Sequence, residues 1–145
     1  MLYLLDTDHL TLFQRNHPAV IARLKDLSPD VIAATVVSAM EQVRGRLAQV
    51  HRAKTAAEVV MAFARFQEAL TFYRTVPILP YDEAAAVQFT RLRQVFPHRP
   101  GTQDLRIAAI ALSRNATLVT RNQRDFQGIA DLHLADWSTP TLEES

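Results

Sequence analysis

Short apolar runs alternate with amphipathic stretches along this chain. Short apolar runs are typical of buried strands, and the chain carries four of them, within residues 1–7, 31–37, 76–79 and 116–120; a last short strand is expected around residues 132–134. Between them apolar residues recur at helical spacing, which predicts helices over residues 9–15, 18–27, 42–54, 55–75, 82–96 and 102–115. Strands that alternate with helices predict a three-layer α/β/α sandwich with a central, mainly parallel sheet.

The predicted elements belong to one domain of residues 1–145. Prolines flank residues 76–79, so this strand is expected near a sheet edge. Residues 41–75 are expected to form an antiparallel helix pair. The residues from about 137 to 145 have little to bury, and we expect them to form a frayed tail.

Three acidic residues follow the ends of predicted strands. Asp6 comes directly after the first strand, Glu41 lies one turn beyond the second, and Asp125 lies in the loop after the fourth. Asp104 begins the last long helix, on the same face as the small residues Ala108 and Ala111. Right-handed crossovers place the carboxyl ends of parallel strands at one edge, so all four carboxylates are expected there.

Several of these polar residues have an alternative role as helix caps. Thr102 can cap the helix that carries Asp104, and Asp8 or Thr7 can cap the helix over residues 9–15. Residues 38–41 have the S-x-x-E form of a capping box. For each acid considered alone, both roles stay open: a helix cap and a residue of a catalytic site.

The composition limits the possible functions. The chain has 145 residues, no cysteine, three glycines and a formal net charge of +1. Thiolate nucleophiles, cysteine zinc sites and glycine-rich nucleotide loops are therefore excluded. No stretch is long enough to span a membrane and no secretory signal is present, so a cytoplasmic location without membrane contact is expected.

Four converging carboxylates predict metal chemistry. At 4 Å and an effective dielectric of 20, each pair of like charges costs about 4 kcal/mol, so such a cluster needs protons or a divalent cation. Oxygen ligands favour hard ions such as Mg²⁺ or Mn²⁺. A water on such an ion can attack phosphorus, which indicates metal-assisted phosphodiester hydrolysis.

Four motifs carry a resemblance to a known family. The chain carries, in this order, the segments LLDTDHL, SAMEQVRG, GTQDLRIAAIAL and LVTRNQRDF. Together they resemble the PIN-domain ribonucleases, most closely the VapC-type toxins of toxin–antitoxin pairs. The resemblance implies a Mg²⁺-dependent endoribonuclease (Mn²⁺ could substitute) that forms a homodimer and is neutralised by an antitoxin. It implies Asp6, Glu41, Asp104 and Asp125 as catalytic residues, Asp6 and Asp104 as metal ligands, and Thr120 and Asn122 in support. Asp8 departs from the Asn or Ser found in many members.

A basic run precedes the long helix over residues 55–75. Arg44, Arg46 and Arg52 lie in a segment that contains no acid between residues 42 and 54. Such a run is usually a solvated helix face, but here it is also the best candidate for a patch that binds RNA phosphates.

Two other functions are weighed against a nuclease. An aspartyl-nucleophile phosphatase or phosphotransferase would explain the D-x-D pattern of Asp6 and Asp8, but that class needs a lysine in the site, and lysine occurs only at Lys25 and Lys54. The second alternative is a catalytically inactive PIN-like binding module, which the intact acids argue against.

Overall fold

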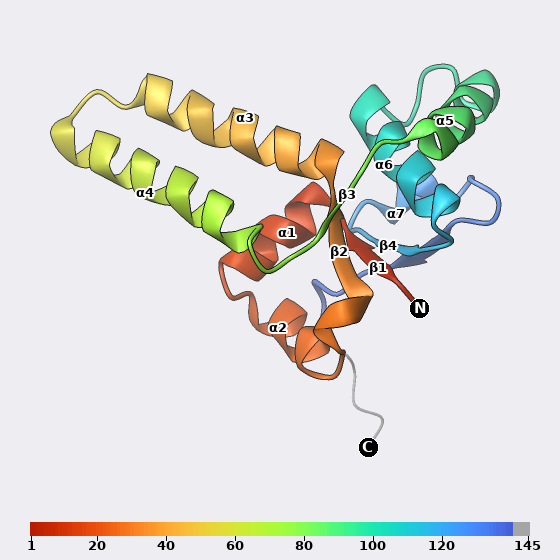
Figure 1. The fold of residues 1–145 in the computed structure, drawn as a ribbon, viewed down its shortest axis with the longest axis horizontal. Coiled ribbons are helices and arrows are strands. Elements are labelled where there is room, and N and C mark those ends of the chain that lie inside the picture. Colours follow the sequence, from red (N-terminus) through yellow and green to blue (C-terminus); the bar gives the residue numbers. More distant parts are fainter. Residues whose placement is uncertain (141–145) are drawn as a thin grey trace.

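The computed structural model describes residues 1–140. Five parallel strands form the central sheet in the order β3-β2-β1-β4-β5 (Figure 1). Their bounds are β1 Tyr3–Leu5, β2 Ile32–Thr35, β3 Ile78–Leu79, β4 Thr117–Val119 and β5 His133–Ala135. All five predicted strands are therefore present, and the one flanked by prolines lies at the sheet edge, as expected.

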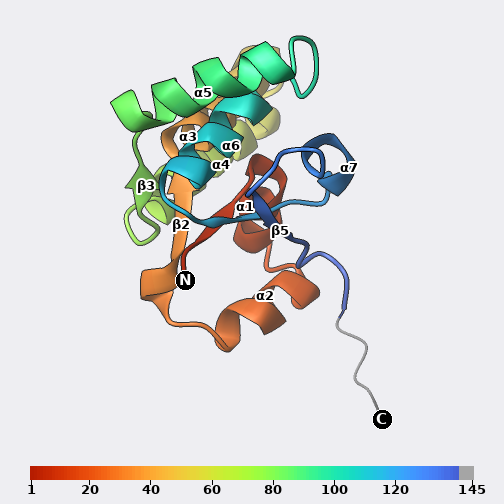
Figure 2. The same ribbon diagram turned by 90° about the vertical axis from the view of Figure 1, so that its right-hand side faces the viewer.

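Helices cover both faces of this sheet (Figure 2). Their bounds are α1 Thr7–Gln14, α2 Pro18–Lys25, α3 Val36–Arg52, α4 Ala56–Phe72, α5 Glu83–Val95, α6 Thr102–Ser113 and α7 Gln123–Phe126, with a 3₁₀ turn at Pro29–Val31. The predicted α/β/α sandwich is confirmed. The short helix α7 was not predicted, because its four residues are too few to show a helical period.

Two apolar clusters form the core, one on each face of the sheet. Successive residues of a strand point to opposite faces. Leu4 thus packs in the cluster beneath α5 and α6, while Leu5 packs in the cluster that contains Leu10 of α1 and Val20 of α2. Helix α6 is buried along most of its length, because small residues at its core positions let it approach the strands closely.

The helices α3 and α4 form the predicted antiparallel pair, which extends away from the sheet as an arm (Figure 1). Each has 17 residues. The arm keeps apolar side chains in solvent, among them Met40 and Leu47 on α3 and Phe63 on α4. Despite these lengths, none of the helices within residues 1–140 is both long and apolar enough to cross a membrane.

The expected start of the C-terminal tail needs correction. Trp137 is only 4% exposed, and its ring lies 5.1 Å from that of Tyr3 on β1. An indole that buries against the sheet holds the chain beyond β5 in place, so the ordered part of the protein includes residue 137. Residues 141–145 of the predicted tail lie outside the described residues.

We expect Trp137→Ala to lower the free energy of unfolding by about 3–5 kcal/mol, because it removes a large side chain from the core and leaves a cavity. Val87→Ala is the matched control, since Val87 is 67% exposed on α5. Urea unfolding followed by circular dichroism measures both. Equal, small effects for the two variants would show that the chain after β5 does not stabilise the fold.

Candidate active site

Asp6 lies at the carboxyl end of β1 and begins helix α1. Its backbone N–H donates to the Val119 carbonyl at 3.0 Å, which ties it to the neighbouring strand β4. Its carboxylate accepts from the backbone N–H of His9 at 2.8 Å, so Asp6 caps α1. The predicted cap at Thr7 or Asp8 is wrong, because α1 starts two residues earlier than expected.

Glu41 reaches the same edge from the second turn of α3. Its Oε1 accepts from the Thr7 hydroxyl at 2.8 Å, so the first residue of α1 orients this carboxylate. The predicted capping box is wrong. Helix α3 starts at Val36, so its cap is Thr35, whose hydroxyl oxygen accepts from the backbone N–H of Ser38 at 3.0 Å.

Thr35 and Ser38 are fully buried at the end of β2, at the base of Glu41's helix. The two hydroxyls also bond to each other at 3.3 Å. Sequence reasoning placed Thr35 inside a strand and missed its role, although a threonine at the boundary of a strand and a helix is a common N-cap signal.

Asp125 is ordered by the loop that follows β4. Its Oδ2 accepts from the Asn122 side-chain amide at 2.8 Å. The backbone N–H of Asn122 in turn donates to the Thr120 hydroxyl at 3.0 Å, and Thr120 is fully buried. The structure therefore brings Thr120, Asn122 and Asp125 into one hydrogen-bonded series.

Asp104 shows that the acids lie near one another. It occupies the first turn of α6, whose cap is Gly101 rather than the predicted Thr102, without a side-chain cap bond. Burial raises the pKa of Asp104 to about 6, and the negative charges of Glu41, Asp6, Asp125 and Asp8 add to this rise. Like charges raise a carboxyl pKa only at close range, so the four predicted acids share one edge, with Asp8 at its margin.

Two arginines lie beside the acids. Arg121 is 3.7 Å from Asp8, and Arg99 is 4.0 Å from Asp125. Both side chains are largely exposed, so these ion pairs are weak and can open when a charged ligand approaches.

The donor set suits a hard divalent ion, since all four side chains offer carboxylate oxygens. Within residues 1–140, however, no three acidic or histidine side chains stand in an arrangement that already encloses a metal ion. Burial and, after it, the neighbouring negative charges raise the pKa of Asp104, and a cation would relieve the repulsion among these charges. The oxygen ligands that these four residues offer are those that Mg²⁺ and Mn²⁺ prefer.

The three arginines of the basic run do not share one surface. Arg44 borders an apolar groove of α3 with Met40 and Leu47. Burial lowers the pKa of Arg46, and the charges of Arg15 and Arg65 lower it further, so Arg46 faces the other side of the helix. Arg52 lies at the far end of the arm.

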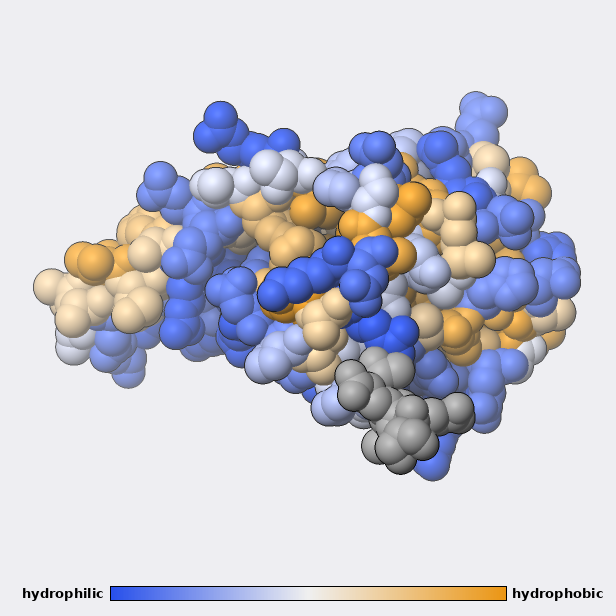
Figure 3. Space-filling view, turned by 90° about the horizontal axis from the view of Figure 1, so that it is seen from below, coloured by the Kyte–Doolittle hydropathy of each residue, from blue (hydrophilic) through white to orange (hydrophobic). Residues whose placement is uncertain are grey.

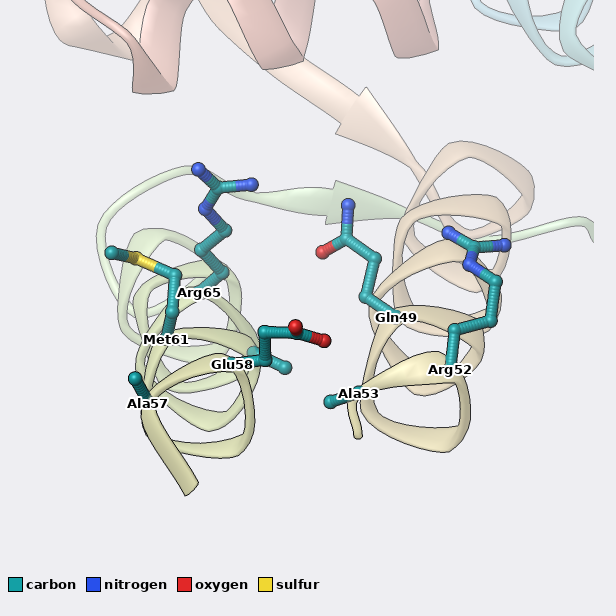
Figure 4. Close-up of a pocket in the computed structure, with 8 residues that line it drawn as sticks. Gln49, Arg52, Ala53, Ala57, Glu58, Met61 and Arg65 are labelled. Atoms are coloured by element: carbon teal, nitrogen blue, oxygen red, sulfur yellow. The ribbon is translucent and has the colours of Figure 1, made fainter. Parts of the chain in front are cut away.

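Cavities on the arm are separate from the acids. Figure 4 shows one between α3 and α4, where Gln49 and Arg52 lie opposite Glu58 and Arg65. Seen from below, the arm carries apolar residues at its far end and a hydrophilic band between that end and the body (Figure 3).

The raised pKa of Asp104 gives a test in metal-free protein. Between pH 3.8 and about 6 the native state keeps a proton that the unfolded state releases, so stability falls as pH rises through this window. At pH 7.5 in EDTA we expect Asp104→Asn to be more stable than the wild type by about 1–2 kcal/mol, after discounting for solvent screening. The gain should shrink at pH 4.5.

Asp131→Asn is the matched control for this measurement. Asp131 is exposed before β5, and its φ of 66° suits asparagine as well as aspartate. Urea unfolding at both pH values compares the variants. A stability gain that does not depend on pH would contradict the raised pKa.

Comparison with known proteins gives relatives that span nearly the whole chain. No family profile matches it. Ribonuclease VapC1 of Haemophilus influenzae (strain R2866) is 29% identical over 143 residues, which cover 95% of this chain and 99% of the relative. A tRNA(fMet)-specific endonuclease VapC of Shigella flexneri is 28% identical over 139 residues, covering 94% and 98%.

Solved structures share the fold. A DNA-bound VapBC from Salmonella typhimurium matches with a TM-score of 0.73 at 26% identity, covering 94% of this chain and 99% of that one. VapBC-1 from nontypeable Haemophilus influenzae matches with a TM-score of 0.75 at 24% identity, covering 96% and 100%. Sequence and fold together confirm the predicted resemblance: over nearly its whole length the chain is similar to VapC ribonucleases, and it shares the fold of VapBC structures.

Proposed function

We propose that this protein is a metal-dependent endoribonuclease that acts as the toxin of a toxin–antitoxin pair. The observation that carries the proposal is the gathering of Asp6, Glu41 and Asp125 around Asp104, whose pKa is raised to about 6 by burial first and then by these neighbouring charges. Natural sequences keep such repulsion where function needs it. Relatives named as VapC ribonucleases support the same reaction class.

Asp6 and Asp104 would hold the metal ion. A bound Mg²⁺ would supply a water of lowered pKa to attack the phosphorus of an RNA phosphodiester. Asp6 is fixed by its place at the end of β1, and Asp104 by the first turn of α6, so each presents its carboxylate from a rigid element. The cytoplasm, where RNA and Mg²⁺ are both present, is the location this activity implies.

Glu41 and Asp125 would position and deprotonate the attacking water. The Thr7 hydroxyl occupies Oε1 of Glu41, and the Asn122 amide occupies Oδ2 of Asp125. Each carboxylate is thereby oriented through one oxygen, while the other can accept a proton. Hydrogen-bonded carboxylates of this kind serve as general bases because they are already aligned before the substrate binds.

A cognate antitoxin and a second copy of the chain are the proposed protein partners. The structural relatives include VapBC toxin–antitoxin complexes. On this chain the exposed apolar residues of the arm, including Val36, Met40 and Phe63, would become buried in such assemblies. Exposed apolar groups that cluster on one element usually mark a contact surface.

The structure weighs against the phosphatase alternative. Lys25 ends α2, and Lys54 lies in the turn between α3 and α4, at the far end of the arm. Neither lysine is part of the acidic edge, so the lysine that this chemistry requires is missing from it. The inactive binding module remains as the alternative that an activity assay separates.

The nuclease proposal predicts that purified protein cleaves RNA with Mg²⁺ or Mn²⁺ and not in EDTA. Asp104→Asn should lower the rate at least about 100-fold, because the amide keeps the shape and loses the charge that binds the metal. Expression without an antitoxin should arrest growth for the wild type and not for this variant. Asp131→Asn, which leaves the site intact, is the control.

Full activity in a folded Asp104→Asn protein would refute the assignment. No cleavage of any RNA by the wild type, with metal bound, would favour the inactive binding module. Sequencing of RNA ends after brief expression would then identify the target of an active enzyme.

The basic run predicts a salt-dependent contribution to RNA affinity. The test replaces three arginines by alanine, singly and together: Arg44, Arg46 and Arg52. All variants also carry Asp104→Asn, which prevents cleavage of the RNA during the binding measurement. Each phosphate contact that is lost should flatten the plot of log Kd against log salt by about 0.7 for single-stranded RNA. Since the three side chains face different directions, single variants show which surface the RNA follows. An unchanged slope in the triple variant would make the run a solvated helix face.

A further inference from the structure

His9 is fully buried between the acidic edge and the segment that follows β5. Its Nδ1 lies 3.1 Å from Oδ1 of Asp6, and its Nε2 accepts from the backbone N–H of Trp137 at 3.2 Å. One imidazole thus connects a proposed metal ligand with a part of the chain 128 residues further on. The function proposed above gives this ring no role.

The bond from Trp137 assigns the tautomer of His9. A backbone N–H can only donate, so Nε2 must present its lone pair to it. The ring proton then lies on Nδ1, where it points at Asp6. The neutral Nδ1–H form is therefore the one that satisfies both contacts.

A doubly protonated ring is the competing arrangement, because Oδ1 of Asp136 lies 3.5 Å from Nε2. That oxygen already accepts from the Ser138 N–H at 2.8 Å and from the Ser138 hydroxyl at 2.6 Å. A proton on Nε2 would also face the N–H of Trp137 and leave that buried donor without an acceptor. Losing such a partner is costly in a site that excludes water.

We propose that His9 is a positioning residue, which holds the Asp6 carboxylate in the orientation required to bind a divalent metal ion. The backbone N–H and Nδ1 of His9 both donate to the same oxygen, Oδ1. The carboxylate is thereby fixed by two bonds in different directions, and Oδ2 is the oxygen presented to the ion. Partners that orient metal-binding carboxylates commonly change metal affinity 10- to 100-fold.

Trp137 in turn fixes the imidazole. It packs against Tyr3 of β1, and its N–H holds Nε2, so the ring cannot turn without losing a buried bond. This inference rests on the proposed role of Asp6 as a metal ligand. Its test therefore includes a measurement that does not depend on metal or RNA.

Two variants separate the contacts of the ring. In His9→Asn the side-chain amide nitrogen lies where Nδ1 was and can still donate to Asp6. In His9→Gln the side-chain oxygen reaches the place of Nε2 and can still accept from Trp137. Titration calorimetry with Mg²⁺ or Mn²⁺ measures affinity, and thermal unfolding in EDTA checks that both variants are folded.

We expect His9→Asn to bind the metal within about threefold of the wild type and His9→Gln to bind at least about tenfold more weakly. Equal losses, or a larger loss for His9→Asn, would show that the ring only fills space and would overturn the proposal. If the wild type binds no divalent ion, the proposed function fails together with this role. If it binds metal and Asp104→Asn still cleaves RNA, only the nuclease assignment fails.

The tautomer is read directly from long-range ¹H–¹⁵N correlation spectra of the metal-free wild type, with His9 assigned through His9→Gln. The expected pattern is protonated Nδ1 and unprotonated Nε2. Signals from the Nε2–H tautomer, which has no Nδ1 proton to donate to Asp6, would overturn the proposal whatever the metal affinities are.

Discussion

Repulsion among carboxylates at the carboxyl edge of a parallel sheet is the constraint on which this structure depends. Parallel strands bring residues from the two ends of the chain to one edge, so Asp6 meets Asp125 and Asp104 although the sequence separates them widely. Three of the acids have local donors: the His9 N–H holds Asp6, the Thr7 hydroxyl holds Glu41, and the Asn122 amide holds Asp125. These bonds offset part of the electrostatic cost and keep the acids in place.

The packing of the core explains how the fold tolerates this electrostatic repulsion. Strands of only two to four residues form the whole sheet, but both faces are covered, and α6 buries a nearly continuous run from Leu105 to Ala111. Small side chains in α6 bring Asp104 close to the strand ends. The crowding of charge thus follows directly from close packing of a helix on a sheet.

The arrangement of the elements could be predicted from the sequence because buried strands and amphipathic helices have different periods. The positions of the acids followed from the parallel sheet. The starts of α1 and α3 were not predicted, since Asp6 and Thr35 fit equally well as strand ends and as caps. His9 and Trp137 were missed because their contact spans 128 residues, and neither local period nor spacing reports such a contact.

Helix α3 belongs both to the arm and to the acidic edge. Helix α3 begins at the buried cap Thr35, carries Glu41 in its second turn and continues for about 25 Å in all to its free end. A partner that buries the exposed apolar residues of the arm would therefore bind the helix that carries Glu41, one of the proposed catalytic carboxylates.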